Sequence, residues 1–305
     1  MTDLAILYEH PQWFAPLFAV LDRRGLDYRA IHADGFFYDP AERQAPGRVV
    51  FNRIAMSSFL RAPEHPIFQA AAALAHWREG GARVLNGADV LAVDASKARQ
   101  LSLIAGLGLA IPATRVVHRA ADLPAAAAAL RFPVVVKANI GGSGAGIVRY
   151  DSAEALAAAV ADGMVPDSID RVLLLQEYVP ARGGRITRIE TLAGRFLYAI
   201  GVDGGGSFDL CPADACVADA GKPTITMTQV QPDPAIVAAA EAIAARVGLD
   251  VGGVEVMIDD RDGTPRFYDI NALSNFVARP MEVLGWDPHE RLADWLESVI
   301  EEARA

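Results

Sequence analysis

Three residues near the C-terminal end, Glu255, Asp269 and Asn271, have the types and spacing of a cation site. Two apolar segments, 254–258 and 266–270, read as the paired strands that carry them. Asp269 and Asn271 are two residues apart, so both side chains face the same side of their strand. Two carboxylates and an amide oxygen suit Mg²⁺ that holds nucleotide phosphates. The alternative is the polar outer face of a hairpin, although Asp and Asn are poor strand formers.

A glycine-rich loop lies earlier in the chain, directly after a short apolar strand. Residues 141–146 read Gly-Gly-Ser-Gly-Ala-Gly, and such glycines let backbone N–H groups turn toward an anion. The loop is not a P-loop, because no Lys-Ser/Thr pair follows, and it is not a dinucleotide fingerprint, because it leads into a strand. Lys137 ends the preceding strand, where its ammonium can reach phosphates that the loop covers. A flexible hairpin turn beside a solvent-facing lysine is the alternative.

Lysine is scarce in this chain, which contains only Lys97, Lys137 and Lys222 among 28 basic residues. Lysine and arginine are not interchangeable where a compact ammonium meets a phosphate. A retained lysine is therefore either chance or a candidate phosphate contact. Lys97 begins a predicted helix, where the helix dipole disfavours a cation unless an anion is shared there.

Other reactive groups lack the spacing of a site. Cys211 and Cys216 have no nearby histidine or third cysteine, which argues against a zinc site. The six histidines show no ligand spacing. No Gly-x-Ser-x-Gly segment is present, so a hydrolase triad has no support.

Composition bounds the class of protein. The 305 residues are 52% hydrophobic, enough for a large core divided over two or three lobes. The net charge of −10 argues against general binding of nucleic acids or anionic membranes. No apolar run of about 20 residues predicts a membrane span, and the N-terminus does not resemble a secretory signal. With only two cysteines, we expect a cytoplasmic protein, and a homo-oligomer is left open.

Strands alternate with helices over the first 92 residues, which predicts a parallel α/β lobe. Its strands are expected at 4–8, 27–32, 48–51 and 82–85, and its helices at 13–24 and 66–80. A helix at 94–106 follows, with Asp94 or Ser96 as its N-cap. A small α+β lobe comes next, with strands at 114–118, 134–138, 147–150 and 171–178 and helices at 123–130 and 152–161. The last part has a hairpin at 188–191 and 195–202, turning at Ala193-Gly194, and helices at 235–247 and 288–303.

In chain order, these features resemble the ATP-grasp superfamily over roughly residues 85–300. The residues that carry the resemblance are Lys97, Pro112 with Thr114, Lys137 before the glycine loop, Gln176-Glu177-Tyr178-Val179, Arg188, Glu255 and Asp269-x-Asn271. Within the superfamily, the chain is similar to the RimK-like carboxylate–amine ligases. The resemblance implies a mixed α/β ATP-grasp fold with an N-terminal parallel pre-ATP-grasp domain at 1–92. The ATP-grasp domain would cover 93–305, with a small lobe at about 113–178 that covers the nucleotide and a C-terminal lobe at about 179–305.

The resemblance also implies a role for each motif. ATP would contact Lys97, Lys137, the loop residues Gly141, Gly142, Ser143, Gly144, Ala145 and Gly146, and the segment Gln176, Glu177, Tyr178 and Val179. Glu255, Asp269 and Asn271 would hold one or two Mg²⁺ ions, with Mn²⁺ as a substitute. Arg188 and Lys137 would be catalytic, stabilising the phosphoryl group in transfer.

Departures from the RimK-like pattern gather on the substrate side. Ile186 stands where the pattern has an aspartate, and the segment 208–214 lacks its Arg-x-Asn. The segment after Asn271 reads Ala-Leu-Ser-Asn-Phe instead of a Ser-Pro-Gly ending. The nucleotide site is therefore expected to be kept, while glutamate is not assigned as the substrate.

A polar pair, Asn52 and Arg53, follows the predicted strand at 48–51. Ligands gather outside the carboxyl ends of strands in open α/β sheets, and arginine can hold a carboxylate bidentately. We therefore expect Arg53 and Asn52 to meet a substrate carboxylate, with Ser274, Asn275 and Arg279 on the opposite wall. A surface role for Arg53 is the alternative.

Together these features predict an ATP-dependent ligase that joins a small carboxylate to an amine through an acyl phosphate. The amine partner is a small molecule or a peptide. Two alternatives stay open: an ATP-grasp kinase that phosphorylates a hydroxyl, and a nucleotide-binding protein with little turnover.

Overall fold

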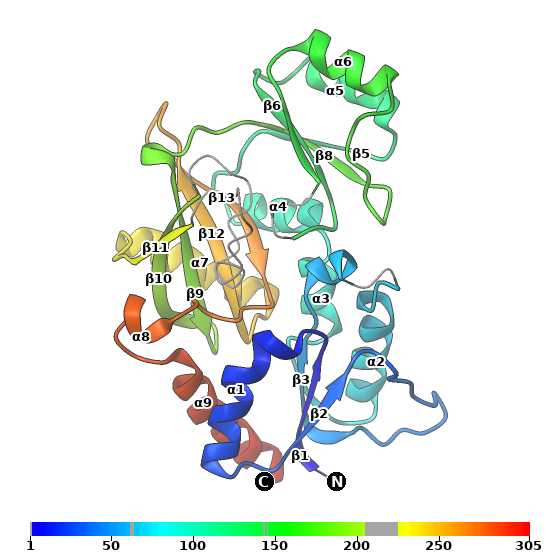
Figure 1. The fold of residues 1–305 in the computed structure, drawn as a ribbon, viewed down its shortest axis with the longest axis vertical. Helices are drawn as coiled ribbons and strands as arrows, with labels where there is room; N and C mark the ends of the chain where they lie inside the picture. The colour runs from blue at the N-terminus through cyan, green and yellow to red at the C-terminus, as the bar shows by residue number, and fades with distance from the viewer. Residues whose placement is uncertain (1, 62–63, 143, 145, 205–224) are drawn as a thin grey trace.

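Three sheets organise the computed structural model, which describes residues 2–61, 64–142, 144, 146–204 and 225–305. Each sheet belongs to one lobe, and the three lobes surround a common centre (Figure 1). Within the described ranges, no helix combines the length and apolar character needed to cross a bilayer.

The N-terminal lobe is a parallel sheet in the order β2-β1-β3-β4. Its strands are β1 (Thr2–Tyr8), β2 (Tyr28–His32), β3 (Gly47–Arg53) and β4 (Arg83–Leu85). Its helices are α1 (Pro11–Arg24), α2 (Ile67–Glu79) and α3 (Ala88–Asp94), with a 3₁₀ turn, η1, at Met56–Leu60. Helix α1 stops at Gly25 because that residue adopts a left-handed conformation with a φ of 68°.

The helix predicted at 94–106 is present from Lys97, and a short helix that was not predicted ends just before it. Helix α3 ends at Asp94, and α4 (Lys97–Gly106) starts after Ser96. The backbone of Ser96 is extended, and its side chain accepts a hydrogen bond from the N–H of Arg99, so Ser96 is the N-cap. Asp94, the other predicted N-cap, does not cap α4 and is the last residue of α3.

The small lobe is an antiparallel sheet in the order β5-β8-β6-β7. It contains β5 (Thr114–Val117), β6 (Val134–Ala138), β7 (Ile147–Tyr150) and β8 (Leu173–Glu177). Helices α5 (Leu123–Ala127) and α6 (Ala153–Ala161) cover one face, together with a 3₁₀ turn, η2, at Ala120–Asp122. The predicted strand at 147–150 is confirmed, so the glycine-rich loop joins two strands.

The C-terminal lobe is an antiparallel sheet in the order β11-β10-β9-β12-β13. Its strands are β9 (Arg185–Leu192), β10 (Arg195–Asp203), β11 (Thr226–Gln229), β12 (Val251–Ile258) and β13 (Pro265–Asn271). A 3₁₀ turn, η3 (Arg182–Gly184), precedes β9, and the helices are α7 (Pro234–Val247), α8 (Pro280–Val283) and α9 (Pro288–Arg304). The predicted hairpin turn is confirmed, since Ala193 and Gly194 both have positive φ, whereas β11 and α8 were not predicted.

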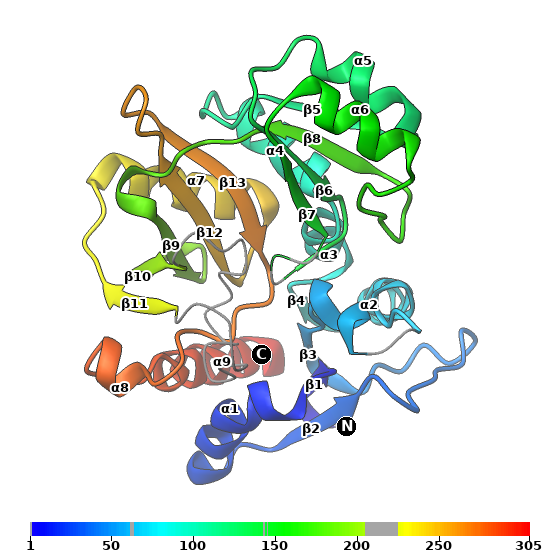
Figure 2. The same ribbon diagram turned by 45° about the horizontal axis from the view of Figure 1, so that its top comes forward.

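Helix α9 ties the two ends of the chain together. It lies beside α1 in both views (Figures 1 and 2), and its buried Leu292 and Leu296 belong to one hydrophobic cluster with Leu4 and Phe51 of the N-terminal sheet. The same cluster includes Ile200 of the C-terminal sheet. Because this core is shared, the N-terminal and C-terminal lobes pack against each other through one continuous hydrophobic cluster. The predicted domain boundary at 92 stays a prediction.

Candidate active site

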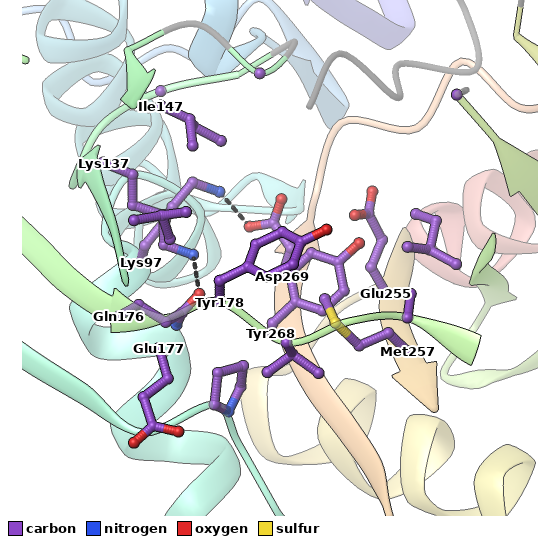
Figure 3. Close-up of a pocket in the computed structure, with 18 of the residues that line it drawn as sticks. Lys97, Lys137, Ile147, Gln176, Glu177, Tyr178, Glu255, Met257, Tyr268 and Asp269 are labelled. Atoms are coloured by element: carbon purple, nitrogen blue, oxygen red, sulfur yellow. Dashed lines mark hydrogen bonds and ion pairs between the residues drawn. The ribbon is translucent and has the colours of Figure 1, made fainter. Parts of the chain in front are cut away.

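A cavity of about 310 Å³ lies between the sheet of the small lobe and the sheet of the C-terminal lobe. Figure 3 shows side chains from both sheets pointing into it. The residues predicted for ATP that line it are Lys97, Lys137, Gly141, Gly142, Gly144, Gln176, Glu177, Tyr178 and Val179. The predicted metal ligands Glu255, Asp269 and Asn271 line it too, as does Arg188. Ser143 and Ala145 lie outside the described residues, and Gly146 is not part of the lining.

Helix α4 places Lys97 over the end of strand β13. The side chain of Gln100 is buried in α4 and exchanges two hydrogen bonds with the backbone of Ile270, at 2.9 and 3.0 Å. This clamp brings the Lys97 ammonium into an ion pair with Asp269 (Figure 3). Burial opposes the charge on Lys97, but the carboxylates of Asp269 and Glu255 outweigh it, so the pKa of Lys97 is raised.

Asn139 joins the two lysine-bearing segments. It follows Lys137 by two residues and is buried. Its side-chain oxygen accepts the N–H of Ala98 at 2.9 Å, and its carbonyl oxygen accepts the N–H of Lys97 at 3.2 Å. The first turn of α4 is therefore fixed to the end of β6, and both ammonium groups reach the same cavity.

Lys137 points from β6 into the cavity through a chain of polar contacts. Its ammonium donates to the side-chain oxygen of Gln176 at 3.0 Å, and the amide nitrogen of Gln176 donates to the hydroxyl of Thr114 at 2.8 Å. Burial, together with the positive charge of Lys97, lowers the pKa of Lys137 to about 8. An anion bound between the two lysines would offset both the burial of the Lys137 ammonium and its repulsion by Lys97.

One row of cross-strand neighbours carries the charged residues of the C-terminal sheet. Glu255 of β12 lies opposite Arg188 of β9 on one side and opposite Asp269 of β13 on the other. Arg188 donates to Glu255 at 3.3 Å and to the buried Glu190 at 2.6 Å. A Cβ atom on Gly253 would lie 2.8 Å from the Arg188 Nε atom, so only glycine leaves room for this pair.

The predicted metal ligands are brought together by this row. Burial and the neighbouring charge of Asp269 raise the pKa of Glu255. Asn271 donates to Glu255 at 3.3 Å. The buried carboxylate of Glu255 and the half-buried carboxylate of Asp269, beside the amide of Asn271, fit a divalent cation with oxygen ligands. In the described part of the chain, no three His, Cys, Asp or Glu residues cluster as metal ligands, and Asn271 contributes the only amide among the three residues predicted to bind the metal.

The segment 176–179 presents its backbone and not all of its side chains to the cavity. The carboxylate of Glu177 points away in Figure 3 and accepts the N–H of Arg131 at 2.9 Å. The N–H of Tyr178 donates to the carbonyl of Pro133 at 2.9 Å. Among the described residues, no hydrogen bond uses the N–H of Val179.

A second, smaller cavity of about 70 Å³ adjoins the first and shares Arg188 and Asp269 with it. Its further lining comes from the N-terminal lobe, the end of α3 and the segment after β13, and includes Trp13, Met56, Ser57, Asp94, Asn275 and Phe276. The glycine-rich loop closes over it, since a Cβ atom on Gly142 would lie 2.9 Å from the Cβ of Ser57. The two cavities together form one cleft between three lobes.

The residues predicted for the substrate separate into different roles. Asn275 lines the small cavity, and its side-chain oxygen is buried without a hydrogen-bond partner. Arg279 is exposed and pairs with Glu282 at 3.0 Å. Ser274 is buried, and its hydroxyl accepts the N–H of Phe276. Asn52 is buried and donates to the carbonyl of Asn86 at 3.0 Å.

Arg53 requires a correction, because it lines neither cavity. Its side chain is 2% exposed, and its guanidinium donates to the carbonyl oxygens of Ala272 and Ser274. It also lies 4.8 Å from the ring centre of Phe51. Strand β3 continues through Arg53, so its side chain faces the core side with Phe51 instead of projecting beyond the strand end. Through these hydrogen bonds, Arg53 holds the backbone of the segment that follows β13 in place.

Comparison with known proteins identifies the architecture. No family model matches the chain, and no curated protein matches its sequence. The ATP-grasp ligase PsnB, complexed with a minimal precursor, superposes with a TM-score of 0.70 at 17% identity, over 98% of this chain and 99% of that chain. The chain has the ATP-grasp fold.

Two further solved structures share the ATP-grasp fold. A RimK domain protein from Sphaerobacter thermophilus gives a TM-score of 0.67 at 19% identity, over 96% of this chain and 99% of that chain. D-alanine–D-alanine ligase from Bacillus anthracis, complexed with ATP, gives 0.69 at 12% identity, over 99% and 97%. The predicted fold class is confirmed, including the N-terminal parallel lobe.

Several residues that build the cleft were missed in the sequence. Asn139 could have been noticed, because it follows Lys137 at strand spacing. Glu190 is two residues from Arg188 on the same strand and offered the same signal. Trp13, Ser57 and Asp94 gave no such signal, because they meet the cleft only through the packing of three lobes.

Proposed function

We propose that this protein is an ATP-dependent ligase that joins a carboxylate to an amine with the help of Mg²⁺, for which Mn²⁺ substitutes. The observation that carries the proposal is the single cleft in which Lys97 and Lys137 face the row Arg188–Glu255–Asp269. Paired lysines opposite paired carboxylates suit a nucleoside triphosphate with its divalent cation.

The adenine end of the cavity is the end beside Val179. Its free N–H, and the apolar side chains of Val135 and Met257 in the lining, support a flat heterocycle there. The phosphates then extend toward Lys137 and Lys97, below the glycine-rich loop. The polar end of the nucleotide thus comes to Arg188, where the two cavities meet.

The chemistry that we propose proceeds in two displacements. A carboxylate oxygen of the substrate attacks the γ-phosphorus of ATP, and ADP leaves with the electrons of the broken P–O bond. The ammonium form of the amine loses a proton to solvent, and its nitrogen then attacks the acyl carbon. Phosphate leaves with the electrons of the broken C–O bond, and the nitrogen gives up a second proton to solvent. Lys97, Lys137 and Arg188 would stabilise the charge on the transferring phosphoryl group without themselves exchanging protons. Bound Mg²⁺ would neutralise phosphate charge from the side of Glu255, Asp269 and Asn271.

Ligands bound in one of the similar structures support this proposal. PsnB was solved with a precursor peptide and, in another complex, with Mg and ADP. Those ligands belong to PsnB, and they make a peptide as reasonable an acceptor here as a small amine. A cytoplasmic enzyme has access to both kinds of substrate and to ATP.

An ADP-release screen tests the proposal and separates it from its alternatives. Purified protein, ATP and Mg²⁺ are combined with each of a panel of carboxylates, with each of a panel of amines, with all carboxylate–amine pairs, and with each of a panel of hydroxyl compounds that carry neither group. A ligase gives its full rate of ADP release only when both partners are present, and mass spectrometry finds the amide. ADP release with a single hydroxyl compound would identify a kinase. Tight ATP binding without ADP release from any pair would identify a nucleotide-binding protein.

A further inference from the structure

Asp94 is a buried carboxylate for which the fold provides no ion-pair partner. It is 8% exposed at the end of α3 and lines the small cavity. In the part of the chain that the structure describes, no lysine or arginine forms an ion pair with it. The backbone of Ala272 hydrogen-bonds its carboxyl group. A buried carboxylate without a paired cation is costly unless a ligand supplies the cation.

The two cations that share the small cavity are already engaged. Lys97 is paired with Asp269, and Arg188 is held between Glu190 and Glu255. Neither is therefore free to neutralise Asp94. Burial raises the pKa of Asp94 to about 7, which is a further sign that its charge is poorly compensated.

A second acceptor lines the same cavity. The side-chain oxygen of Asn275 is buried and has no hydrogen-bond partner. Buried polar atoms normally find a partner, so this oxygen calls for a donor from a bound molecule. A carboxylate and an amide oxygen both accept hydrogen bonds, and the group that satisfies both with one positive charge and three donors is a primary ammonium.

We propose that the small cavity binds the amine substrate through its ammonium group, held by Asp94 and Asn275. This inference rests on the proposed ligase function, and it assigns the amine and not the carboxylate to this end of the cleft. The walls from Trp13, Met56 and Phe276, with a volume of about 70 Å³, admit only a small head group. Because Arg188 and Asp269 line both cavities, the amine lies beside the phosphate end of the nucleotide.

The competing explanation is that Asp94 merely balances the buried Arg53. Burial lowers the pKa of Arg53 to about 9, and the negative charges of Glu190 and Asp94 work against that shift. A purely structural Asp94 would affect folding but would not discriminate between ligands. The test therefore measures selective binding.

Ligand-observed NMR of the full-length protein with Mg-ADP provides the first arm. The probes are methylammonium and ethanolamine, with methanol and acetate as neutral and anionic controls. We expect millimolar binding of at least one ammonium probe, weakened at least tenfold in Asp94→Asn. Asp250→Asn, which changes another largely buried carboxylate outside the cleft, should leave it unchanged. Absence of ammonium binding to the wild type, equal binding of methanol, or equal binding to Asp94→Asn would overturn the inference.

A second variant covers the case in which Asp94→Asn does not fold. Asn275→Asp adds a negative charge at the same wall and should tighten ammonium binding several-fold, with acetate still excluded. Unchanged ammonium affinity in this variant would refute the assignment.

Kinetics separate this inference from the ligase proposal. If the ADP-release screen finds a pair of substrates, Asp94→Asn should raise KM for the amine at least tenfold and leave KM for ATP unchanged. An unchanged amine KM would remove the subsite and keep the ligase. Selective ammonium binding without ADP release from any pair would keep the subsite and remove the ligase.

Discussion

The two cavities of the cleft share Arg188 and Asp269 but are built by different means. The large one lies between two antiparallel sheets, and its lysines have polar partners, Lys97 in an ion pair with Asp269 and Lys137 in a hydrogen bond to Gln176. The small one is lined by strand residues such as Arg188 and Asp269 on one side. On the other side it is lined by a helix end, a 3₁₀ turn and two loops, and it contains one buried acceptor without a partner, the side-chain oxygen of Asn275.

This difference indicates which cavity is needed for turnover of any substrate and which one selects the substrate. Strand register fixes the large cavity, because Glu255 cannot move relative to Arg188 and Asp269 without breaking the sheet. Segments outside the sheets can change without that penalty, and loops set on a rigid scaffold are where binding specificity usually lies. We therefore expect mutations at the large cavity to abolish turnover with any substrate, and mutations at the small cavity to change which substrate is used.

The largest effect is expected for Asp269→Ala, which removes a wall that both cavities share. ADP release should fall by about 10²–10³-fold, the range for loss of one preorganised electrostatic contact. Folding should be largely retained, as judged by circular dichroism and thermal unfolding, because Asp269 is not in a hydrophobic cluster. The control Asp89→Ala changes an exposed carboxylate of α3 and should keep full activity. An active Asp269→Ala protein would remove the metal assignment.

The next largest effect concerns the stability of the protein and tests whether Arg53 has a structural role or binds the substrate. Arg53→Met removes the donors to the carbonyls of Ala272 and Ser274 and should lower the free energy of unfolding by about 3 kcal/mol, the upper range for hydrogen bonds to a charged group. Urea denaturation measures it. Arg279→Met alters an exposed arginine and should change stability by less than about 0.5 kcal/mol.

The same variant also tests the prediction from sequence that Arg53 contacts a substrate carboxylate. If Arg53→Met keeps its stability and loses affinity for the substrate carboxylate, while ATP still binds, then Arg53 is a binding residue after all.

Sequence alone predicted which side chains meet at the large cavity, because those on its strands obey strand periodicity. The two-residue spacing of Asp269 and Asn271 fixes their common face, and Lys137 at the end of an apolar strand precedes the loop that covers it. The small cavity could not be predicted in this way. Whether Asp94 lies in a cleft depends on where α3 ends and on how three lobes pack, and neither is encoded in local spacing.

Arg53 shows the same limit at a single residue. A strand expected to end at residue 51 places Arg53 beyond the sheet, whereas β3 extends to Arg53 and turns it inward. An error of two residues in the predicted end of a strand is thus enough to assign a side chain to a ligand when it contacts the core.

A smaller effect on turnover is expected for Lys137→Arg, which keeps the charge but enlarges the head group beside Gln176 in a buried position. We expect at least a ~10-fold loss of ADP release, equivalent to about 1.4 kcal/mol in the barrier. Lys222→Arg, which lies outside the described residues and outside every motif, is the matched control and should be near silent. Equal effects of the two changes would show that scarcity of lysine does not mark the site.

The smallest effect is a pH dependence that is confined to the large cavity. Burial and the charge of Lys97 lower the pKa of Lys137 to about 8, so the ammonium that attracts phosphate is lost as the pH rises through that value. ATP affinity should therefore decrease above pH 8, by at most about tenfold per pH unit because one proton is involved. The pKa of Lys97 is raised, so that residue keeps its charge over the same range. Titration of ATP with constant Mg²⁺ between pH 7 and 9.5 measures the slope. Lys137→Arg should give a flat profile because a guanidinium stays protonated there, and a slope equal to that of the wild type would assign the titration to another group.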